Sequence, residues 1–377
     1  MVLEDICEFI VDCPHSTAPD EGKGYPIIRT PNVGKGRLIL DGVQRVSKET
    51  YDKRNVRAVP QAGDIIFARE APAGNAAIIQ EGQEVCLGQR TVLIRPNKEK
   101  VYPDYLVYYI LAPQQQYELL GTANGATVAH VNLPVIRKMP VDIPDIDTQK
   151  KMAEVIATYD NLIENNQKQI KLLDEAVQRI YKEWFIDFRF TDYKKNEFIN
   201  DIPQGWRKGT LGDIATFKRG KTITKANVHK GDVPVVAGGL GPAYYHNEAN
   251  TKAPVITVSG SGANAGFTRL YNVDVFASDC SFLDSEGSPS IYYIYCFLKA
   301  NKAQLDALQK GAAQPHVYAK DINSMELIVP TEKIISSFCE LTKPYFEKIK
   351  CLQRQIELLN QARDRLLPKI MNGEIEV

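Results

Sequence analysis

The sequence of 377 residues has no excess of charge of either sign. Lysine and arginine total 46, and aspartate and glutamate also total 46. A protein that coats DNA regardless of sequence gains its affinity by neutralising phosphates, so it needs a surplus of basic residues. The balance argues against a simple cationic DNA-coating protein, and any DNA-binding surface must gather its basic residues locally.

Paired cysteines and long apolar runs are also lacking. The seven cysteines are scattered, their number is odd, and no two have CxxC spacing. This argues against a disulfide framework or a zinc ribbon and fits a reducing cytoplasm. No apolar run approaches the roughly 18 residues that a membrane helix requires, and residues 1–5 do not resemble a signal peptide. We expect a cytoplasmic protein with no membrane partner.

Signatures of catalysis and of cofactor binding are missing or incomplete. Gly260–Ala265 fits GxGxxA, but the residues after it do not begin a helix, as a nucleotide-binding loop requires. Gly220-Lys221-Thr222 ends like a P-loop, yet Ala215 stands where the first glycine is needed. The sequence shows no methyltransferase catalytic motif and no HExxH pattern. We expect no catalytic residue, no cofactor and no metal ligand.

What the sequence does contain is an internal repeat with a long period. His130-Val131 recurs as His316-Val317, and Met139 recurs as Met325, each time 186 residues later. The same shift continues without a gap into the helical segments that follow. A period of this length is far too long for a solenoid. It indicates duplication of a whole domain together with a helix.

The matched segments predict two long helices, each with apolar residues in a heptad pattern. The predicted seam consists of Ile156, Tyr159, Ile163, Ile170, Leu173, Val177 and Ile180 in the first helix, and of Tyr345, Ile349, Leu352, Ile356, Leu359 and Leu366 in the second. Asn166 and Arg363 interrupt the pattern, and Arg363 is expected to weaken the seam locally. Each helix either packs on its own domain or pairs with the other. Seams too long for one small domain to cover favour pairing.

The segment before each helix is expected to be a mixed α/β domain. Short β-rich runs such as Asp64–Ala68 and Val255–Val258 are separated by glycine and proline, and one helical stretch follows in each half, Tyr105–Leu120 and Ile291–Leu308. We therefore divide the chain into a first domain at residues 1–145, a long helix at 146–190, a second domain at 191–330 and a C-terminal helix at 331–377.

Four stretches resemble the specificity subunits of type I restriction–modification systems. They are residues 202–206 (Ile-Pro-Gln-Gly-Trp) with 211–214, residues 63–69, residues 140–156, and residues 181–188. Each is short, so their order, together with the repeat, carries the resemblance over the whole chain. Residues 1–5 lack a counterpart of 202–206, and the second helix lacks the Trp184-Phe185 exit of the first.

The resemblance implies an α+β fold with two mixed α/β target-recognition domains, separated by two long helices that pair as an antiparallel coiled coil with pseudo-twofold symmetry. It implies a non-catalytic subunit that binds a split, asymmetric target in double-stranded DNA, one half-site per domain. The implied protein partners are two methyltransferase subunits and, as an option, restriction or translocase subunits. Lengthening Ile156–Ile180 is then expected to change the gap between the half-sites.

Contacts with bases and phosphates require arginine, lysine and polar side chains. The candidates are Arg29, Lys35, Arg37, Arg69 and Arg90 in the first domain, and Lys218, Arg219, Lys221, Lys225 and Arg269 in the second. For each of them alone, a solvated surface charge is the alternative. His130 and His316 are expected to be hydrogen-bonded structural histidines.

Three other functions remain open at this point. A free-standing DNA-binding regulator with two modules would need strong affinity on its own, which the zero net charge disfavours. A coiled-coil scaffold that binds only protein would leave the glycine-flanked basic clusters without a role. An adenine methyltransferase would need the catalytic motif that the sequence lacks.

Overall fold

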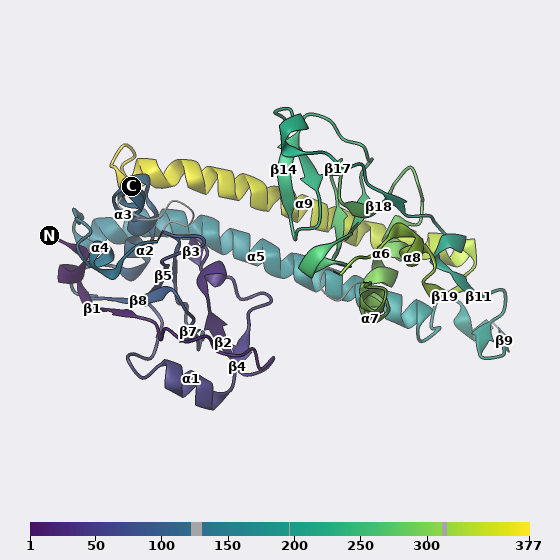
Figure 1. Cartoon of the computed structure of the whole chain (residues 1–377), viewed down its shortest axis with the longest axis horizontal. Helices are drawn as coiled ribbons and strands as arrows, with labels where there is room; N and C mark the ends of the chain where they lie inside the picture. Colours follow the sequence, from purple (N-terminus) through teal and green to yellow (C-terminus); the bar gives the residue numbers. More distant parts are fainter. Residues whose placement is uncertain (122–129, 196, 311–314) are drawn as a thin grey trace. The chain divides into compact units, whose positions relative to one another are not determined.

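The computed structural model describes residues 1–121, 130–195, 197–310 and 315–377. The chain forms two compact units, one from Met1–Asn166 with Gln355–Val377 and the other from Gln167–Arg354. Helices α5 (Ile146–Phe185) and α9 (Glu332–Met371) have 40 residues each, and each contributes one part to each unit (Figure 1). The compact units thus differ from a linear division into two domains and two helices, because each unit includes part of both long helices.

The first unit is built around a five-stranded sheet in the order β1-β8-β5-β6-β3, in which only β3 and β6 are parallel. A smaller sheet, β4-β2-β7, lies in the same unit. The elements before α5 are η1 (Leu3–Ile6), β1 (Cys7–Asp12), β2 (Tyr25–Ile28), η2 (Thr30–Asn32), β3 (Gly36–Arg37), β4 (Arg45–Val46), α1 (Lys48–Arg54), β5 (Ile65–Ala68), β6 (Ala76–Ile78), β7 (Cys86–Leu87), β8 (Thr91–Pro96), α2 (Pro103–Leu111), α3 (Pro113–Gly121) and α4 (Leu133–Arg137).

Strand β5 shows why this sheet is buried on both faces. Side chains of a strand point alternately to opposite faces. Ile65 and Phe67 belong to the core that includes α2 and Ile156 of α5, whereas Ile66 and Ala68 belong to a second core beneath the small sheet. A strand with two apolar faces reads as a continuous apolar run, as Ile65–Ala68 does.

The second unit contains a four-stranded sheet, β12-β18-β15-β16, a three-stranded sheet, β14-β13-β17, and two short pairs. Its elements between the long helices are η3 (Tyr193–Lys195), β9 (Phe198–Ile199), β10 (Ile202–Pro203), β11 (Arg207–Thr210), η4 (Leu211–Asp213), β12 (Lys218–Arg219), η5 (Lys225–Asn227), β13 (Val233–Val236), β14 (Pro242–His246), β15 (Val255–Ser259), η6 (Gly262–Asn264), β16 (Thr268–Tyr271), β17 (Phe276–Ala277), β18 (Cys280–Asp284), α6 (Ile291–Ala300), α7 (Lys302–Ala307), α8 (Ala319–Asn323) and β19 (Glu326–Val329).

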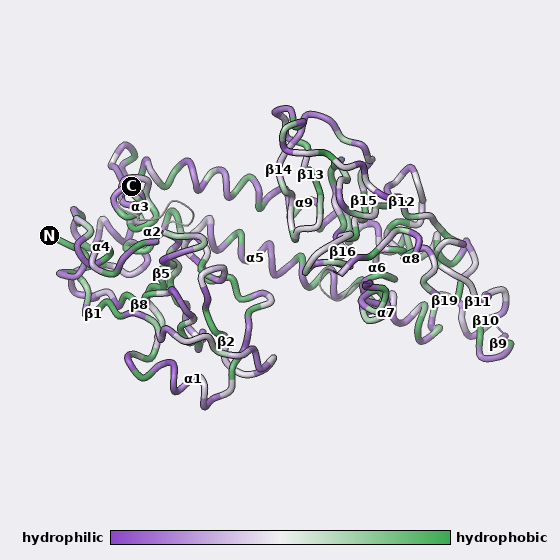
Figure 2. Tube along the Cα trace, in the orientation of Figure 1, coloured by the Kyte–Doolittle hydropathy of each residue, from purple (hydrophilic) through white to green (hydrophobic). Residues whose placement is uncertain are grey.

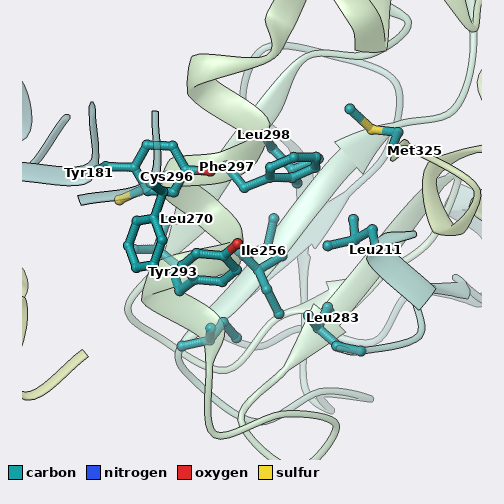
Figure 3. Close-up of a cluster of buried hydrophobic side chains, with 14 of the residues drawn as sticks. Tyr181, Leu211, Ile256, Leu270, Leu283, Tyr293, Cys296, Phe297, Leu298 and Met325 are labelled. Carbon is teal, nitrogen blue, oxygen red and sulfur yellow. The ribbon is translucent and has the colours of Figure 1, made fainter. Parts of the chain in front are cut away.

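The core of the second unit joins its sheet to the long helices through α6. Figure 3 shows Tyr181 of α5 beside Tyr293 and Cys296 of α6, with Ile256 and Leu283 contributed by the strands. The aromatic rings of Tyr181 and Tyr293 have centroids 5.7 Å apart. The strands and α6 of the second unit are therefore fixed to the long helices by apolar packing.

The long helices pair antiparallel within each unit. In the first unit Asp160 contacts Arg363 and Asn166 contacts Gln355. Residue numbers therefore rise along α5 while those of the contacted residues fall along α9. In the second unit the rings of Trp184 and Phe338 are 5.9 Å apart. Figure 2 shows hydrophilic and hydrophobic residues alternating along both helices, as an amphipathic helix requires.

Every predicted seam residue is buried or half-buried. Buried are Ile156, Ile163, Val177, Ile349 and Leu352, and half-buried are Tyr159, Ile170, Leu173, Ile180, Tyr345, Ile356, Leu359 and Leu366. Arg363, which was expected to weaken the seam, has a charged partner. Its Nη1 lies 2.7 Å from Asp160 Oδ1, so the guanidinium has a carboxylate partner where an apolar contact was expected.

The described helices include none that is long and apolar enough to cross a membrane. All seven cysteines have free thiols. Within the described ranges, no group of three or more histidine, cysteine, aspartate or glutamate side chains is arranged to hold a metal ion.

Candidate nucleic-acid interface

The densest group of exposed basic residues lies at the edge of the four-stranded sheet of the second unit. Lys218 and Arg219 form β12, which pairs with β18, and Lys221 and Lys225 follow within the next six residues. All four side chains belong to exposed residues. Among the described residues, no carboxylate lies within 4.0 Å of any of their charged nitrogens. We call Lys218–Lys225 the basic segment.

The backbone of the basic segment is held firmly although its side chains are free. Gly220 N–H donates to the carbonyl of Cys280 at 2.8 Å, and Lys221 N–H donates to that of Ala277 at 3.0 Å. A side chain at Gly220 would collide with the carbonyl oxygens of Ala277 and Ser278. Glycine is therefore needed because two backbones meet here. The charges project from a fixed frame.

An aromatic strand adjoins the basic segment. The Tyr244 hydroxyl of β14 donates to the carbonyl of Ile223 at 2.7 Å, so β14 is tied to the segment. Tyr245, the next residue, points to the other face of β14 and is 55% exposed. Tyr244 therefore ties β14 to the basic segment, whereas the exposed ring of Tyr245 lies on the opposite face of that strand.

Arg269 is not brought to the basic segment. It lies on β16, at the opposite edge of the sheet from β12. Its Nη1 donates to the carbonyl of Leu240 at 2.9 Å, and its guanidinium lies 5.0 Å from the centre of the Tyr271 ring. Arg269 is exposed but supports the loop before β14, so its predicted DNA contact stays a prediction with a structural alternative.

In the first unit the fold brings Arg29 and Arg90 onto neighbouring loops. Strand β2 pairs in parallel with β7, and Gly88 N–H donates to the carbonyl of Ile28 at 2.8 Å. Arg29 follows β2, and Arg90 follows Gly88, so residues 61 positions apart in sequence lie on adjacent loops. Both residues are exposed, and so is Lys35 between η2 and β3.

Arg69 belongs to an internal polar network and not to an open surface. Its Nη1 is 2.8 Å from Asp12 Oδ2, its Nε donates to the carbonyl of Val131 at 2.9 Å, and its Nη2 is 2.8 Å from His130 Nε2. His130 Nδ1 is in turn 2.6 Å from Glu70 Oε1. The guanidinium is only 11% exposed. These contacts favour a positioning role for Arg69.

The same network also reaches an exposed candidate. The Arg90 guanidinium lies 2.6 Å from Glu70 Oε2 and is 62% exposed. Arg69 N–H donates to the carbonyl of Arg90 at 2.9 Å. The network therefore fixes the loop that presents Arg90.

Arg37 is turned towards α5. Its Nε lies 3.5 Å from Glu164, its Nη2 donates to Asn161 Oδ1 at 3.3 Å, and its Nη1 is 3.8 Å from Asp104. Burial raises the pKa of the Asp104 carboxyl, and the charge of Arg37 opposes that rise. These contacts attach the η2–β3 loop to the long helix and leave little of the guanidinium for DNA.

The two repeated histidines have different surroundings. His130 uses both ring nitrogens in the network described above, as expected for a hydrogen-bonded structural histidine. His316 is held through its backbone, which exchanges two hydrogen bonds with Lys310, and its ring stacks on Tyr318 with centroids 6.0 Å apart. His130 is therefore hydrogen-bonded through its ring, as expected. The ring of His316 stacks on Tyr318.

Comparison with known proteins accounts for the repeated architecture. The family described as Type I restriction modification DNA specificity domain matches residues 1–175 and 203–364. The chain belongs to this family. The two matched stretches correspond to the two halves of the repeat, and together they cover most of the chain.

The chain aligns with similar proteins over most of the length of both sequences. The chain is 27% identical to the type I restriction enzyme MjaIX specificity subunit of Methanocaldococcus jannaschii, over 90% of this chain and 83% of that protein. It is 20% identical to the HindI specificity subunit of Haemophilus influenzae, over 83% and 86%. The solved type I restriction–modification S subunit of M. genitalium has the same fold, with a TM-score of 0.53 at 16% identity, covering 98% of this chain and 95% of that one.

The acidic partners of the basic candidates were not foreseen from the sequence. Asp12 lies 57 residues from Arg69, and Glu164 lies 127 residues from Arg37. No local pattern links such pairs, because they meet only when the sheet and α5 assemble. Gly220 within the basic segment was a usable signal, since a glycine at a strand end can mark a close backbone approach.

Proposed function

We propose that the chain is the DNA specificity subunit of a type I restriction–modification complex. Each unit would bind one half of a split target in double-stranded DNA, and the chain itself would carry no catalytic site. The observation that carries the proposal is the basic segment: four exposed cations, with no carboxylate partner among the described residues, on a hydrogen-bonded backbone in a chain of this family. It provides the local gathering of charge that a chain of zero net charge needs.

The two units would recognise different half-sites. The second presents Lys218, Arg219, Lys221 and Lys225 from one sheet edge, whereas the first presents Arg29 and Arg90 from adjacent loops, with Lys35 nearby in sequence. Base recognition depends on where each donor lies in the groove. Two differently built surfaces therefore support an asymmetric target.

The outer faces of the long helices support two equivalent docking sites for methyltransferase subunits. Leu172 and Arg179 of α5 recur 186 residues later as Leu358 and Arg365 of α9, and all four are exposed. Leu172 is 64% exposed and Leu358 is 48% exposed. Exposed leucines at matched positions suit a partner that docks twice in the same way.

The proposal is tested by co-expressing the chain with the methyltransferase subunit of its host system and mapping methylated bases over the genome. We expect a split, asymmetric motif that appears only when both proteins are present. If the two proteins neither associate nor mark such a motif, the proposal fails. A chain that binds one DNA site tightly alone would instead support the two-module regulator.

A further inference from the structure

A buried ion pair joins the two long helices in the first unit, and the recognition domain makes a hydrogen bond to it. Asp160 of α5 is 3% exposed, and its Oδ1 lies 2.7 Å from Arg363 Nη1. Its other oxygen accepts a hydrogen bond from the Tyr108 hydroxyl at 2.7 Å. Gly36, at φ +92°, packs against the same carboxylate. The buried charge is thus satisfied from the partner helix and from the recognition domain.

The matched place in the second unit is apolar. The 186-residue shift of the repeat carries Asp160 onto Phe346 and Arg363 back onto Val177. Phe346 is 1% exposed and Val177 is 0% exposed, and both belong to the same buried cluster. The rings of Phe346 and Tyr292 stack with centroids 4.2 Å apart. One layer of the helix pair is therefore a charge pair in one unit and a hydrocarbon contact in the other.

This difference decides which helices can pair. When α5 pairs with α9, Asp160 faces Arg363 and Val177 lies in one apolar cluster with Phe346. If the α5 helices of two copies paired in the same register, Asp160 of each copy would face Val177 of the other. Paired α9 helices would likewise set Arg363 against Phe346. Each like-with-like pairing buries two charges without partners, which is strongly unfavourable.

We propose that the Asp160–Arg363 pair is a pairing-specificity element that directs α5 to α9 and excludes like-with-like pairing between two copies of the chain. Three apolar layers of the seam give no such discrimination. Ile163 recurs as Ile349, Ile170 as Ile356 and Leu173 as Leu359, so these layers are the same in either pairing. Because these three layers match, discrimination must come from a layer that differs, as single polar positions provide in other coiled coils.

The test traps pairs of α5 from two copies by cysteine cross-linking of the full chain. If Asp160 of one α5 helix faces Val177 of another, the twofold axis of the antiparallel pair lies between residues 168 and 169. A Gln169→Cys substitution would therefore bring the thiols of the two copies close together. The exposed Cys351 is replaced by serine in all variants. Leu172→Cys, on the outer face, is the matched control for random collisions. Each protein is refolded from denaturant before a short bifunctional maleimide is added.

Two double variants remove the charges in different ways. Asp160→Asn with Arg363→Gln keeps the shapes and an acceptor for Tyr108, and Asp160→Leu with Arg363→Leu makes the layer apolar. With the native pair, we expect dimer at the level of the Leu172→Cys control. In either double variant we expect at least about tenfold more cross-linked dimer than with the native pair.

Two results would overturn the proposal. One is a native pair that cross-links through Gln169→Cys as strongly as the neutral variants. The other is a pair of folded double variants that stay at the control level. A double-mutant cycle on thermal midpoints gives an independent check: each single substitution should lower the midpoint by roughly 5–10 °C, and the double variant should lose clearly less than the sum. Additive losses would show that the two residues are not coupled.

Discussion

The two units of the chain solve the same structural problem with different chemistry. Each must fix a recognition domain to a pair of antiparallel helices. Both units use apolar packing, but at one matched layer the first unit has Asp160, Arg363 and Tyr108, whereas the second has Phe346, Val177 and Tyr292. The outer-face residues Leu172 and Leu358 are nevertheless alike. The repeat thus varies where the chain must tell its halves apart and matches where a partner would dock twice.

The basic candidates differ between the units in the same way. In the first unit Arg37 and Arg69 are engaged by internal carboxylates and only the exposed Arg29, Lys35 and Arg90 remain towards solvent. In the second unit the basic segment has its backbone fixed and its side chains free. The number of basic residues in the sequence therefore overstates the positive charge that is available to DNA. The overstatement is larger for the first unit than for the second.

The largest effect is expected from truncating the apolar junction of the second unit. Phe346→Ala should destabilise that unit by about 3–5 kcal/mol, because a fully buried ring is removed and a cavity is left. Both tryptophans of the chain, Trp184 and Trp206, lie in the core of this unit, so tryptophan fluorescence reports its unfolding directly. The control is Leu358→Ala on the exposed face, which should change the free energy of unfolding by less than ~0.5 kcal/mol. Equal effects of the two variants would contradict the buried role of Phe346.

A smaller loss is expected from opening the polar network of the first unit. Arg69→Met keeps much of the side-chain bulk but removes the contacts of the guanidinium with Asp12, His130 and the carbonyl of Val131, which should cost about 2–3 kcal/mol. Circular dichroism measured through denaturation gives the change, while the tryptophan transition should move less. Arg29→Met, at an exposed position with no such network, is the matched control. If Arg69→Met is as mild as Arg29→Met, Arg69 is not a positioning residue.

The basic segment should affect binding and not folding. Replacing Lys218, Arg219, Lys221 and Lys225 together by alanine removes four cations, so the slope of log affinity against log salt should become shallower by about 3–4. The measurement is fluorescence anisotropy of labelled duplex DNA with the chain and its methyltransferase partner at several salt concentrations. The thermal midpoint should stay unchanged because none of the four contacts a described carboxylate. A slope that does not change would remove the basic segment from the interface.

The smallest effect is expected at the outer faces of the helices. Leu172→Asp and Leu358→Asp should each weaken docking of the methyltransferase subunit by about 1–2 kcal/mol, because each removes one exposed leucine from the contact. Titration calorimetry should show one of the two sites weakened in each variant, with the affinity of the other site unchanged. Loss at only one of the two positions would contradict the equivalence of the docking sites.

Periodic features of the sequence predicted much of the fold. Contacts between side chains far apart in the sequence could not be predicted. The heptads of α5 and α9, the 186-residue repeat and the β-rich fronts all follow from local patterns that bury one face. The partner of Arg363 was not predicted because Asp160 lies 203 residues away in the sequence. Arg37 and Arg69 were placed with the DNA-binding candidates for the same reason, since a sequence does not show which carboxylate a guanidinium will meet.

The most direct test of the account is to assign each half of the methylated motif to one unit. The chain is co-expressed with its methyltransferase partner in three forms: native, with Lys218, Arg219, Lys221 and Lys225 replaced by alanine, and with Arg29 and Arg90 replaced by alanine. We predict that the first variant relaxes or loses recognition of one half-site, and that the second variant affects only the other half-site. If both variants alter the same half-site, or if neither changes the motif, the division of recognition between the two units is contradicted.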